Sequence, residues 1–229
     1  MKESFDKNWE VNVYSKKKQL NKYPYDILVS IIARKFFSIP ESDRRKINVL
    51  DLGCGAGNNA KFLAESGFNV FGIDGSKSAI KTCIERFKGW DLKANFAQGD
   101  LLSLPYKDNF FDLVIDRESL YANSFDSIQK IVGAVYKKLK KNGLFVSFCY
   151  NSYHPDRSFG KEIEINTYED FSNGTFREAG KAHFVDIKEI IKLYAKFKIE
   201  NIMRNSLSEV YDKSKKIIEF EEYIIVIKK

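Results

Sequence analysis

The segment with the most distinctive chemistry is Val49-Leu-Asp-Leu-Gly-Cys-Gly-Ala-Gly57, in which an apolar run leads into three alternating glycines. Because glycine has no Cβ, Gly53, Gly55 and Gly57 permit a tight strand-to-helix turn and let a ligand approach the backbone closely. Dinucleotides and other nucleoside cofactors both bind at such turns. The glycine pattern alone therefore does not separate these cofactor classes.

Three acidic side chains narrow the choice of cofactor. Asp51 stands just ahead of the glycines, where a carboxylate can engage the ammonium of an amino-acid moiety, directly or through water, and would repel a pyrophosphate. Asp74 ends the second expected strand, where it can accept hydrogen bonds from both ribose hydroxyls, and Asp100 is placed to accept one from an adenine amino group. The NAD fingerprint also requires glycine or alanine where this chain has Asn58.

These motifs resemble those of the class I S-adenosylmethionine-dependent methyltransferases of the small-molecule type. The likeness covers about residues 47 to 150. It rests on five ordered segments, Val49-Leu-Asp-Leu-Gly-Cys-Gly-Ala-Gly57, Gly72-Ile-Asp-Gly-Ser76, Gly99-Asp-Leu101, Phe111-Asp-Leu-Val-Ile-Asp116 and Leu139-Lys-Lys-Asn-Gly-Leu144.

The resemblance implies S-adenosylmethionine as the cofactor and S-adenosylhomocysteine as its product. In this family pattern the glycines line the cofactor, Asp74 holds its ribose, and Asp100 with Leu101 meets adenine. The full set of expected cofactor-binding residues is Asp51, Gly53, Gly55, Gly57, Asp74, Gly75, Asp100, Leu101 and Arg117. No metal site is expected, because the three cysteines are widely spaced and form no Cys-x-x-Cys pair.

Methyl transfer from a sulfonium is an in-line displacement, so holding the acceptor close and aligned supplies much of the catalysis and a dedicated base is optional. If a base acts, the candidates are the two histidines, His154 and His183, which flank the expected cap. A loop histidine that only hydrogen-bonds backbone is the competing interpretation.

The acceptor is expected to lie between the end of the fourth strand and two less regular segments. Glu118 and Tyr121 follow that strand, and Arg157 and Arg177 could bind a carboxylate or phosphate, or could simply be solvated. Residues 14–26 resemble the N-terminal lid of small-molecule methyltransferases. Tyr14 and Tyr25 in this segment would close over the cofactor or acceptor, or would only pack on the domain.

From residue 47 onward, short β-rich apolar runs alternate with amphipathic stretches, which is typical of βαβ units in a parallel sheet. We expect strands at 47–52, 69–73, 94–98, 111–116 and 144–150, with helices near 58–66, 76–88 and 125–140. A further helix at 186–194 and closing strands at 198–204 and 220–227 follow. The fold class is therefore α/β, a doubly wound, mostly parallel, seven-stranded Rossmann-like sheet with helices on both faces and a small substrate cap. By the family resemblance, its last strand is antiparallel.

The expected organisation is one methyltransferase domain with two additions. Residues 1–46 form an N-terminal helical lid, residues 47–229 bind the cofactor, and a cap is inserted at about 151–185. Within this insertion 162–165 could form a short strand. Long ordered insertions in compact domains are usually functional, so we interpret it as a substrate cover, with a surface excursion as the alternative.

Composition adds limits on partners and compartment. The net charge of +7 could indicate nucleic acid, but the densest basic cluster, Lys137, Lys138, Lys140 and Lys141, also suits the end of a helix, where cations complement the dipole. No secretory signal pattern opens the chain, and the apolar run at 223–227 is too short to span a bilayer. We expect a cytoplasmic monomer or homodimer that needs neither a membrane nor nucleic acid.

The favoured function is methyl transfer to an oxygen or nitrogen of a small metabolite, such as a sugar, a phosphorylated compound or a natural-product precursor. The alternatives are an RNA or other nucleic-acid methyltransferase and a nucleoside-binding module without catalysis. Against the nucleic-acid enzyme, Asp116-Arg-Glu-Ser119 stands where amino-methylating nucleobase enzymes carry Asn/Asp-Pro-Pro-Tyr/Phe. An NAD oxidoreductase ranks below these because of Asp51 and Asn58.

Overall fold

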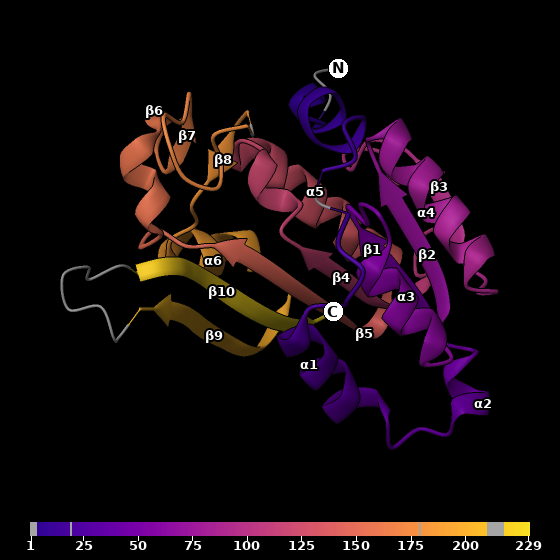
Figure 1. Ribbon diagram of the computed structural model, residues 1–229. Helices are drawn as coiled ribbons and strands as arrows, with labels where there is room; N and C mark the ends of the chain where they lie inside the picture. Colours follow the sequence, from indigo (N-terminus) through magenta and orange to yellow (C-terminus); the bar gives the residue numbers. More distant parts are fainter. Residues whose placement is uncertain (1–3, 19, 179, 210–217) are drawn as a thin grey trace.

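The computed structural model describes residues 4–18, 20–178, 180–209 and 218–229. Its centre is a seven-stranded sheet of order β3-β2-β1-β4-β5-β10-β9 (Figure 1). The strands are β1 (Asn48–Leu52), β2 (Asn69–Asp74), β3 (Asn95–Gln98), β4 (Phe111–Arg117), β5 (Leu139–Tyr150), β9 (Lys198–Ser208) and β10 (Ile218–Lys228). The first five pair in parallel, whereas β10 runs antiparallel to β5 and β9. The predicted fold class is confirmed.

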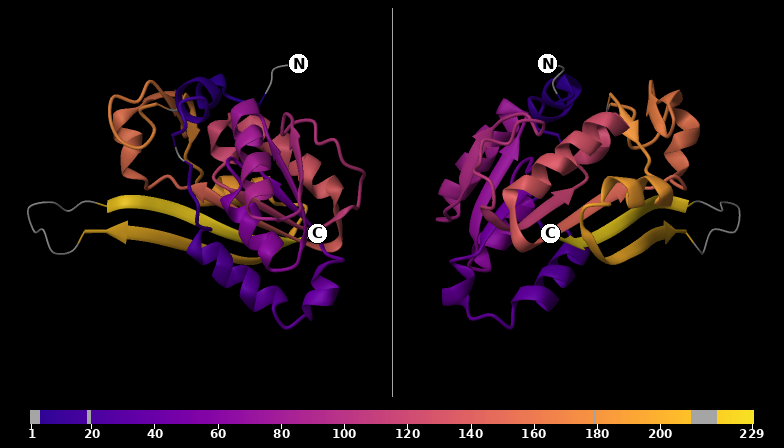
Figure 2. Two further views of the ribbon diagram at one scale, coloured as in Figure 1. Left: turned by 45° about the vertical axis from the view of Figure 1, so that its right-hand side comes forward. Right: turned by 180° about the vertical axis from the view of Figure 1, so that it is seen from behind.

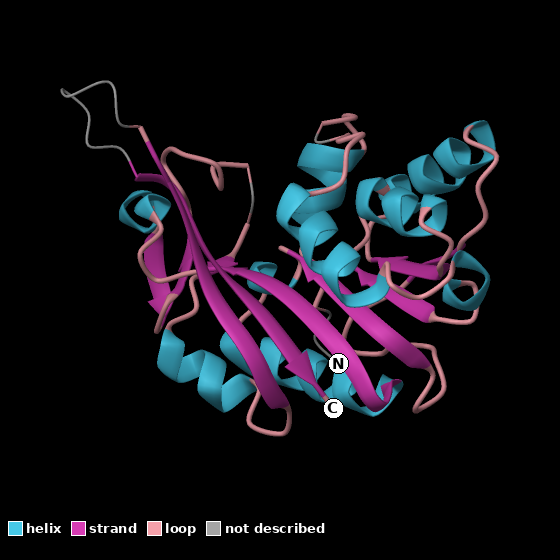
Figure 3. Ribbon diagram, turned by 90° about the horizontal axis from the view of Figure 1, so that it is seen from below, coloured by secondary structure: helices cyan, strands magenta, loops and turns pink. Residues whose placement is uncertain are grey.

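Helices cover both faces of this sheet (Figure 3). They are α1 (Asp26–Phe36), α2 (Glu41–Arg44), α3 (Asn58–Glu65), α4 (Lys77–Gly89), α5 (Phe125–Lys138) and α6 (Ile187–Leu193). Because side chains alternate along a strand, neighbouring residues of β1 enter opposite layers. Val49 packs with Leu28 of α1 and Leu63 of α3, and Leu50 packs in the layer of α5 and α6.

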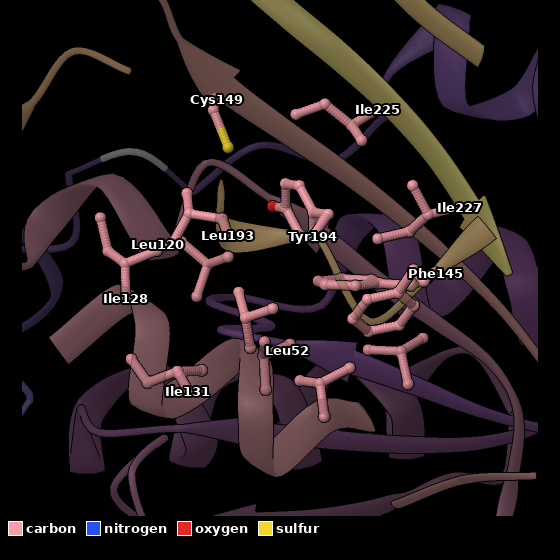
Figure 4. Close-up of a cluster of buried hydrophobic side chains, with 14 of the residues drawn as sticks. Leu52, Leu120, Ile128, Ile131, Phe145, Cys149, Leu193, Tyr194, Ile225 and Ile227 are labelled. Carbon is pink, nitrogen blue, oxygen red and sulfur yellow. The ribbon is translucent and has the colours of Figure 1, made fainter. Parts of the chain in front are cut away.

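The layer under α5 and α6 is the larger core. Figure 4 shows its side chains converging from the sheet and both helices, among them Leu52 of β1, Ile131 of α5 and Tyr194 just after α6. Figure 4 also shows Ile225 and Ile227 of β10 in this cluster. This packing places the closing antiparallel strand in the same core as the first strand of the sheet.

The strand order reverses between β1 and β4. The chain continues from β1 to β2 on one side of this pair and from β4 to β5 on the other. In open α/β sheets, ligands bind in the crevice beyond the carboxyl ends of strands at such a switch point. The glycines that follow Leu52 and the residues that follow Arg117 both stand there. The fold therefore positions a ligand site between these two turns.

The expected elements are all present, with shifted boundaries. The fifth strand begins at Leu139 rather than at residue 144, because α5 ends at Lys138 and the next residues already pair with β4 across a register shift. The two closing strands are longer than expected and form a hairpin that extends beyond the helices (Figure 2). The residues joining the two strands, 210–217, lie outside the described ranges.

The cap has its own small sheet and its own core. Strands β6 (Lys161–Glu164), β7 (Thr167–Glu169) and β8 (Ala182–His183) pair antiparallel, after the short helix η3 (Pro155–Phe159). An aromatic cluster that includes Tyr168, Phe171, Phe176 and Phe184 joins it to Tyr150 at the end of β5. The described part of the insertion therefore has its own sheet and core, and its role as a substrate cover stays a prediction.

Two further short helices lie beside the switch point. The π-helix η1 (Trp9–Tyr14) and the 3-10 helix η2 (Leu120–Ala122) approach it from the N-terminal segment and from the end of β4. Figure 1 shows the indigo N-terminal segment between the cap and α4. Over the described parts of the chain, no helix is long and apolar enough to cross a membrane.

Candidate active site

The turn after β1 is built from glycines in left-handed backbone conformations. Gly53, Gly55 and Gly57 have φ of 71°, 51° and 84°, which side chains with a Cβ rarely adopt. Space is also limiting, since a Cβ on Gly55 would stand 2.6 Å from the hydroxyl oxygen of Tyr14. One on Gly53 would overlap the side chain of Ser119. The turn therefore keeps bare backbone at the switch point and at the N-terminus of α3.

A pocket of about 310 Å³ opens over this turn. Its walls come from the N-terminal segment, the glycine turn, the end of β2, the residues after β4 and the end of β5. Ten of the residues predicted from the sequence line it, namely Tyr14, Tyr25, Gly53, Gly55, Asp74, Gly75, Leu101, Arg117, Glu118 and Tyr121. The other predicted cofactor and acceptor residues do not line this cavity, namely Asp51, Gly57, Asp100, Arg157 and Arg177.

Asp74 is the best-fixed polar group of the pocket. One carboxylate oxygen accepts from the Gly55 amide at 2.9 Å and the other from the Ser76 amide at 2.8 Å. Burial raises the pKa of Asp74 to about 6, against the lowering effect of these two amides. Each oxygen keeps lone pairs for further donors, so the carboxylate can accept from a pair of ligand hydroxyls.

Asp51 is a buried carboxylate that forms no ion pair with any residue that the structure describes. It is 1% exposed, and its Oδ2 has no hydrogen-bond partner among the residues that the structure describes. Burial raises its pKa to about 7, helped by the charges of Asp74 and Asp116. An ammonium group held nearby would offset this clustered negative charge, which fits the amino-acid part of the expected cofactor.

Asp100 is engaged differently from the expectation. Its carboxylate accepts from the Ser4 amide at 2.6 Å, the Ser4 hydroxyl at 2.5 Å and the Leu102 amide at 2.8 Å. Its neighbour Leu101 lines the pocket, whereas Asp100 anchors the N-terminal segment. A contact from Asp100 to adenine stays a prediction and would require Ser4 to give up a hydrogen bond.

The other end of the pocket combines one ion pair with several aromatic rings. The Arg117 guanidinium lies 4.0 Å from the ring centre of Tyr25 and pairs with the Oε2 atom of Glu118. The same Oε2 accepts from the Tyr150 hydroxyl at 2.6 Å, and Tyr121 packs edge-on against Tyr150. Burial raises the pKa of the Tyr150 hydroxyl well above its usual value, so the phenol remains a donor.

Tyr25 connects this end of the pocket to the closing hairpin. Its hydroxyl donates to Glu222 of β10 at 2.6 Å, and the Asn205 amide of β9 donates to the same carboxylate at 2.9 Å. Burial raises the pKa of the Tyr25 hydroxyl above its ordinary value. The lid is therefore tied to strands that lie nearly 200 residues away in the chain, because 197 positions separate the two residues.

Sequence reasoning missed several lining residues. Ser4, Phe5 and Trp9 come from an opening stretch with no recognisable motif, and Tyr150 was regarded only as the end of a strand. Phe5 lies against Gly75, and Trp9 packs against Tyr14 with ring centres 6.2 Å apart. The only sequence signal for these residues is that the aromatic residues Phe5 and Trp9 precede the lid segment 14–26.

The structure does not support either histidine as a base at this pocket. His154 is 2% exposed, and its Nδ1 accepts from the Asp156 amide at 3.2 Å, while its ring packs among Tyr150, Phe176 and Phe184. Burial lowers the pKa of His154, so the ring is neutral near pH 7. The aromatic core of the cap thus encloses the side chain that was expected to reach the acceptor.

His183 is enclosed in the same way. It is 1% exposed, its Nδ1 lies 2.8 Å from the Thr167 hydroxyl, and its Nε2 lies 3.3 Å from Glu189. These contacts join β8 to β7 and to α6. His183 therefore holds the cap together and does not face the pocket.

The two expected arginines of the cap also lie elsewhere. Arg157 donates to the Tyr168 hydroxyl at 2.8 Å and to the backbone carbonyl of Ser152, which places it inside the cap. Arg177 borders two further depressions between the N-terminal segment and the cap, one shared with Asp6 and Lys181 and the other with Trp9 and Glu178. Neither arginine lines the main pocket, so their role in binding substrate stays a prediction.

Comparison with known proteins agrees with this arrangement. Residues 49–143 match the family model described as a methyltransferase domain. A putative methyltransferase from Geobacillus sp. is 27% identical over 165 residues, covering 72% of this chain and 66% of that protein. A ubiquinone biosynthesis O-methyltransferase from Rickettsia typhi is 33% identical over 119 residues, covering 52% and 47%. The chain thus spans about half to two thirds of the length of these relatives.

Solved structures share the fold. A SAM-dependent methyltransferase from Methanosarcina mazei has a TM-score of 0.70 at 20% identity, covering 90% of this chain and 98% of that chain. An S-adenosylmethionine-dependent methyltransferase from Clostridium acetobutylicum has a TM-score of 0.61 at 18% identity, covering 89% and 98%. The matched methyltransferase domain, the methyltransferase relatives and the shared fold together support a class I S-adenosylmethionine-dependent methyltransferase.

Proposed function

We propose that the protein transfers the methyl group of S-adenosylmethionine to an oxygen or nitrogen atom of a small metabolite and releases S-adenosylhomocysteine. The observation that carries this proposal is Asp74, held by the Gly55 and Ser76 amides on the wall of a pocket that the glycine turn opens. A carboxylate fixed in this way is preorganised for the two ribose hydroxyls of a nucleoside.

The remaining pocket residues fit the other parts of the cofactor. Gly53, Gly55 and Gly75 would let it approach the backbone, and Leu101 would contact the adenine. The uncompensated charge near Asp51 favours the ammonium of the methionine part. The Nε atom of Arg117 has no partner among the described residues and is buried, so it can donate to the carboxylate of that same part.

The bound cofactor would supply a methyl group on a positively charged sulfur. This chain would supply alignment and exclusion of water, since Trp9, Tyr14 and Tyr25 of the N-terminal segment line the pocket and would cover the bound ligands. Among the described lining residues there is no histidine. Any proton lost by the acceptor would go to Glu118 or to water.

A small acceptor fits the site better than a nucleic acid. The densest basic cluster is partly neutralised, with Lys138 2.8 Å from Asp108 and Lys140 2.8 Å from Asp112. These pairs lie at the end of α5 and the start of β4, away from the carboxyl edge of the sheet where the pocket opens. The relatives include a ubiquinone biosynthesis O-methyltransferase and a sterol 24-C-methyltransferase, so they support no single attacking atom.

Calorimetric titration with S-adenosylhomocysteine, NAD and a short RNA tests the proposal without knowledge of the acceptor. Micromolar binding of S-adenosylhomocysteine alone is the expected result. Preference for NAD, or absence of S-adenosylhomocysteine binding, would contradict the proposal. Steeply salt-dependent RNA affinity would favour the nucleic-acid alternative.

A further inference from the structure

The acceptor end of the pocket contains a carboxylate that is only half satisfied. The Oε2 atom of Glu118 pairs with Arg117 and accepts from the Tyr150 hydroxyl at 2.6 Å. Its Oε1 atom is buried and has no hydrogen-bond partner within the described part of the chain. A carboxylate oxygen left without donors is costly unless a ligand supplies them.

The backbone of this residue is unusual as well. Glu118 has φ of 56°, in the left-handed region that residues other than glycine avoid. The turn is held by Asp116, whose carboxylate accepts from the Ser119 amide at 2.9 Å and the Leu120 amide at 3.3 Å. This strained turn places the Glu118 side chain on the pocket wall.

The charges of the pocket favour a cation at this position. The described lining side chains include three carboxylates, Asp6, Asp74 and Glu118, and one cation, Arg117. Asp6 and Asp74 are already hydrogen-bonded to backbone amides of this chain. If Arg117 faces the carboxylate of the cofactor, as proposed above, Glu118 is left as the negative group that faces the acceptor.

Several aromatic rings line the same pocket as this carboxylate. Tyr121 and Tyr150 have ring centres 4.7 Å apart, and Trp9 lies 6.4 Å from Tyr121. Tyr25 already accepts one cation on its face, the guanidinium of Arg117. Ring faces attract cations, and the attraction is stronger where water is excluded. A carboxylate within such a ring set therefore selects for a positively charged group.

We propose that the acceptor is an amine, which binds as an ammonium against Glu118 and is methylated on nitrogen. This inference rests on the proposed function and specifies its acceptor. A neutral alcohol would donate one hydrogen bond to Oε1, but that bond would lack the charge assistance of an ammonium donor. A carboxylate acceptor would be repelled by Glu118.

The chemistry balances with groups that are present. The ammonium gives one proton to Glu118, which passes it to water, and the freed nitrogen lone pair forms the new N–C bond. The C–S bond of the sulfonium breaks and its electron pair stays on sulfur as the thioether of S-adenosylhomocysteine. The product leaves as a methylated ammonium, so one methyl group moves and one proton is released.

Three probes of matched shape test the selectivity, namely 2-phenylethylamine, 2-phenylethanol and phenylacetate. Each is titrated into the full-length protein saturated with S-adenosylhomocysteine, whose own binding is measured first. We expect the amine to bind at least about tenfold more tightly than the alcohol, and phenylacetate most weakly, because the amine makes a charge-assisted hydrogen bond to Glu118. Incubation with S-adenosylmethionine should then yield N-methyl-2-phenylethylamine by mass spectrometry.

The substitution Glu118→Gln removes the charge at nearly constant shape. It should weaken amine binding by roughly ten- to hundredfold and leave binding of 2-phenylethanol within about threefold. The matched control is Glu200→Gln on β9, which alters a surface ion pair with Lys35 of α1 and should change neither affinity.

Several outcomes would overturn the inference. These are equal affinity for amine and alcohol, tighter binding of phenylacetate, no binding of any probe to the S-adenosylhomocysteine complex, or unchanged amine affinity in Glu118→Gln. The wild-type comparison of the three probes stands even if that variant does not fold. Failure of S-adenosylhomocysteine itself to bind would instead overturn the proposed function, on which the inference rests.

Discussion

The proposed cofactor end and the proposed acceptor end of the pocket are built on different principles. At the cofactor end, Gly53, Gly55 and Asp74 come from strand ends that lie next to each other in the sheet, and backbone amides hold the carboxylate. At the proposed acceptor end, Tyr121 packs against both Trp9 of the N-terminal segment and Tyr150 of β5. The first end depends on local backbone geometry, whereas the second depends on contacts between remote parts of the chain.

The same contrast appears in how polar groups are treated. Asp74 has backbone donors on both oxygens, while Glu118 keeps one oxygen without a partner among the described residues. A carboxylate with protein donors on both oxygens suits the cofactor, which is the same in every turnover. A carboxylate with one oxygen left without a donor can accept a hydrogen bond from the acceptor. We therefore expect weakening of the cap to reduce binding at the acceptor end more than binding of the cofactor.

The largest expected effect is on the cofactor end. Asp74→Ala removes the acceptor of two ribose hydrogen bonds, each worth about 1.5 to 3 kcal/mol when the acceptor is charged, so S-adenosylhomocysteine affinity should fall by more than a hundredfold. Titration calorimetry measures it. Asp43→Ala, which alters an exposed pair with Lys46, is the control. Unchanged S-adenosylhomocysteine affinity in Asp74→Ala would show that Asp74 does not bind the cofactor.

The next effect is on the cap alone. Phe176, 1% exposed, packs against Tyr121 and Tyr150, so Phe176→Ala should lower the free energy of unfolding by about 3 to 5 kcal/mol. Denaturant unfolding measures the loss, and the half-exposed Phe37→Ala should cost below about 1 kcal/mol. At temperatures where the variant is folded, S-adenosylhomocysteine affinity should stay within about threefold. A parallel loss of that affinity would mean that the two ends are not independent.

A smaller effect tests the contact between the lid and the glycine turn. Gly55→Ala combines a positive φ with a Cβ 2.6 Å from the Tyr14 hydroxyl, and should weaken S-adenosylhomocysteine binding by about 1 to 3 kcal/mol. Gly133→Ala is the matched control, because a Cβ there meets nothing within 4 Å and alanine favours the helix. Calorimetry on both variants gives the comparison. Equal affinities would show that the lid does not close on the turn.

The raised pKa of Asp51 predicts a pH dependence. In the unfolded chain this carboxyl titrates near 3.8 and in the folded protein near 7, so its protonated form stabilises the fold below about 3.8 and this contribution is lost as pH rises to 7. Asp51→Asn should therefore raise the free energy of unfolding by about 1 to 2 kcal/mol at pH 8. Denaturant unfolding at pH 5 and pH 8 measures it. If Asp51→Asn does not raise the free energy of unfolding at pH 8, the charge of Asp51 is already compensated in the folded protein.

Binding of an ammonium near Asp51 favours its charged form, so S-adenosylhomocysteine affinity should rise as pH increases through about 7. Calorimetry in buffers of different ionisation enthalpy detects the proton released. Asp51→Asn should abolish that release. A variant that still releases the proton would assign it to another group.

The smallest expected effect concerns the enclosed histidines. His154→Gln should change the rate of methyl transfer by less than about threefold per folded molecule, whereas loss of a true general base costs about 100- to 10,000-fold. The rate is measured with whichever acceptor is methylated in the screen, and the folded fraction is taken from circular dichroism. A hundredfold loss would restore His154 as a base.

The sequence by itself determined the sheet and the cofactor turn, because these depend on local patterns. Alternating apolar residues predict strands, glycines predict the left-handed turn, and a carboxylate that ends β2 must stand beside that turn once the strands pair in parallel. For this reason Asp74 and the glycines could be placed before any coordinates were known.

Only the tertiary structure decided the acceptor side. Whether His154 faced the pocket or the cap depended on how Phe176 and Phe184 pack, and that contact joins residues with no shared local pattern. The same holds for Asp100, whose partner Ser4 lies 96 positions away. Aromatic and carboxylate partners of this kind are chosen by the packing of the whole chain, so their positions follow from three-dimensional contacts and not from spacing in the sequence.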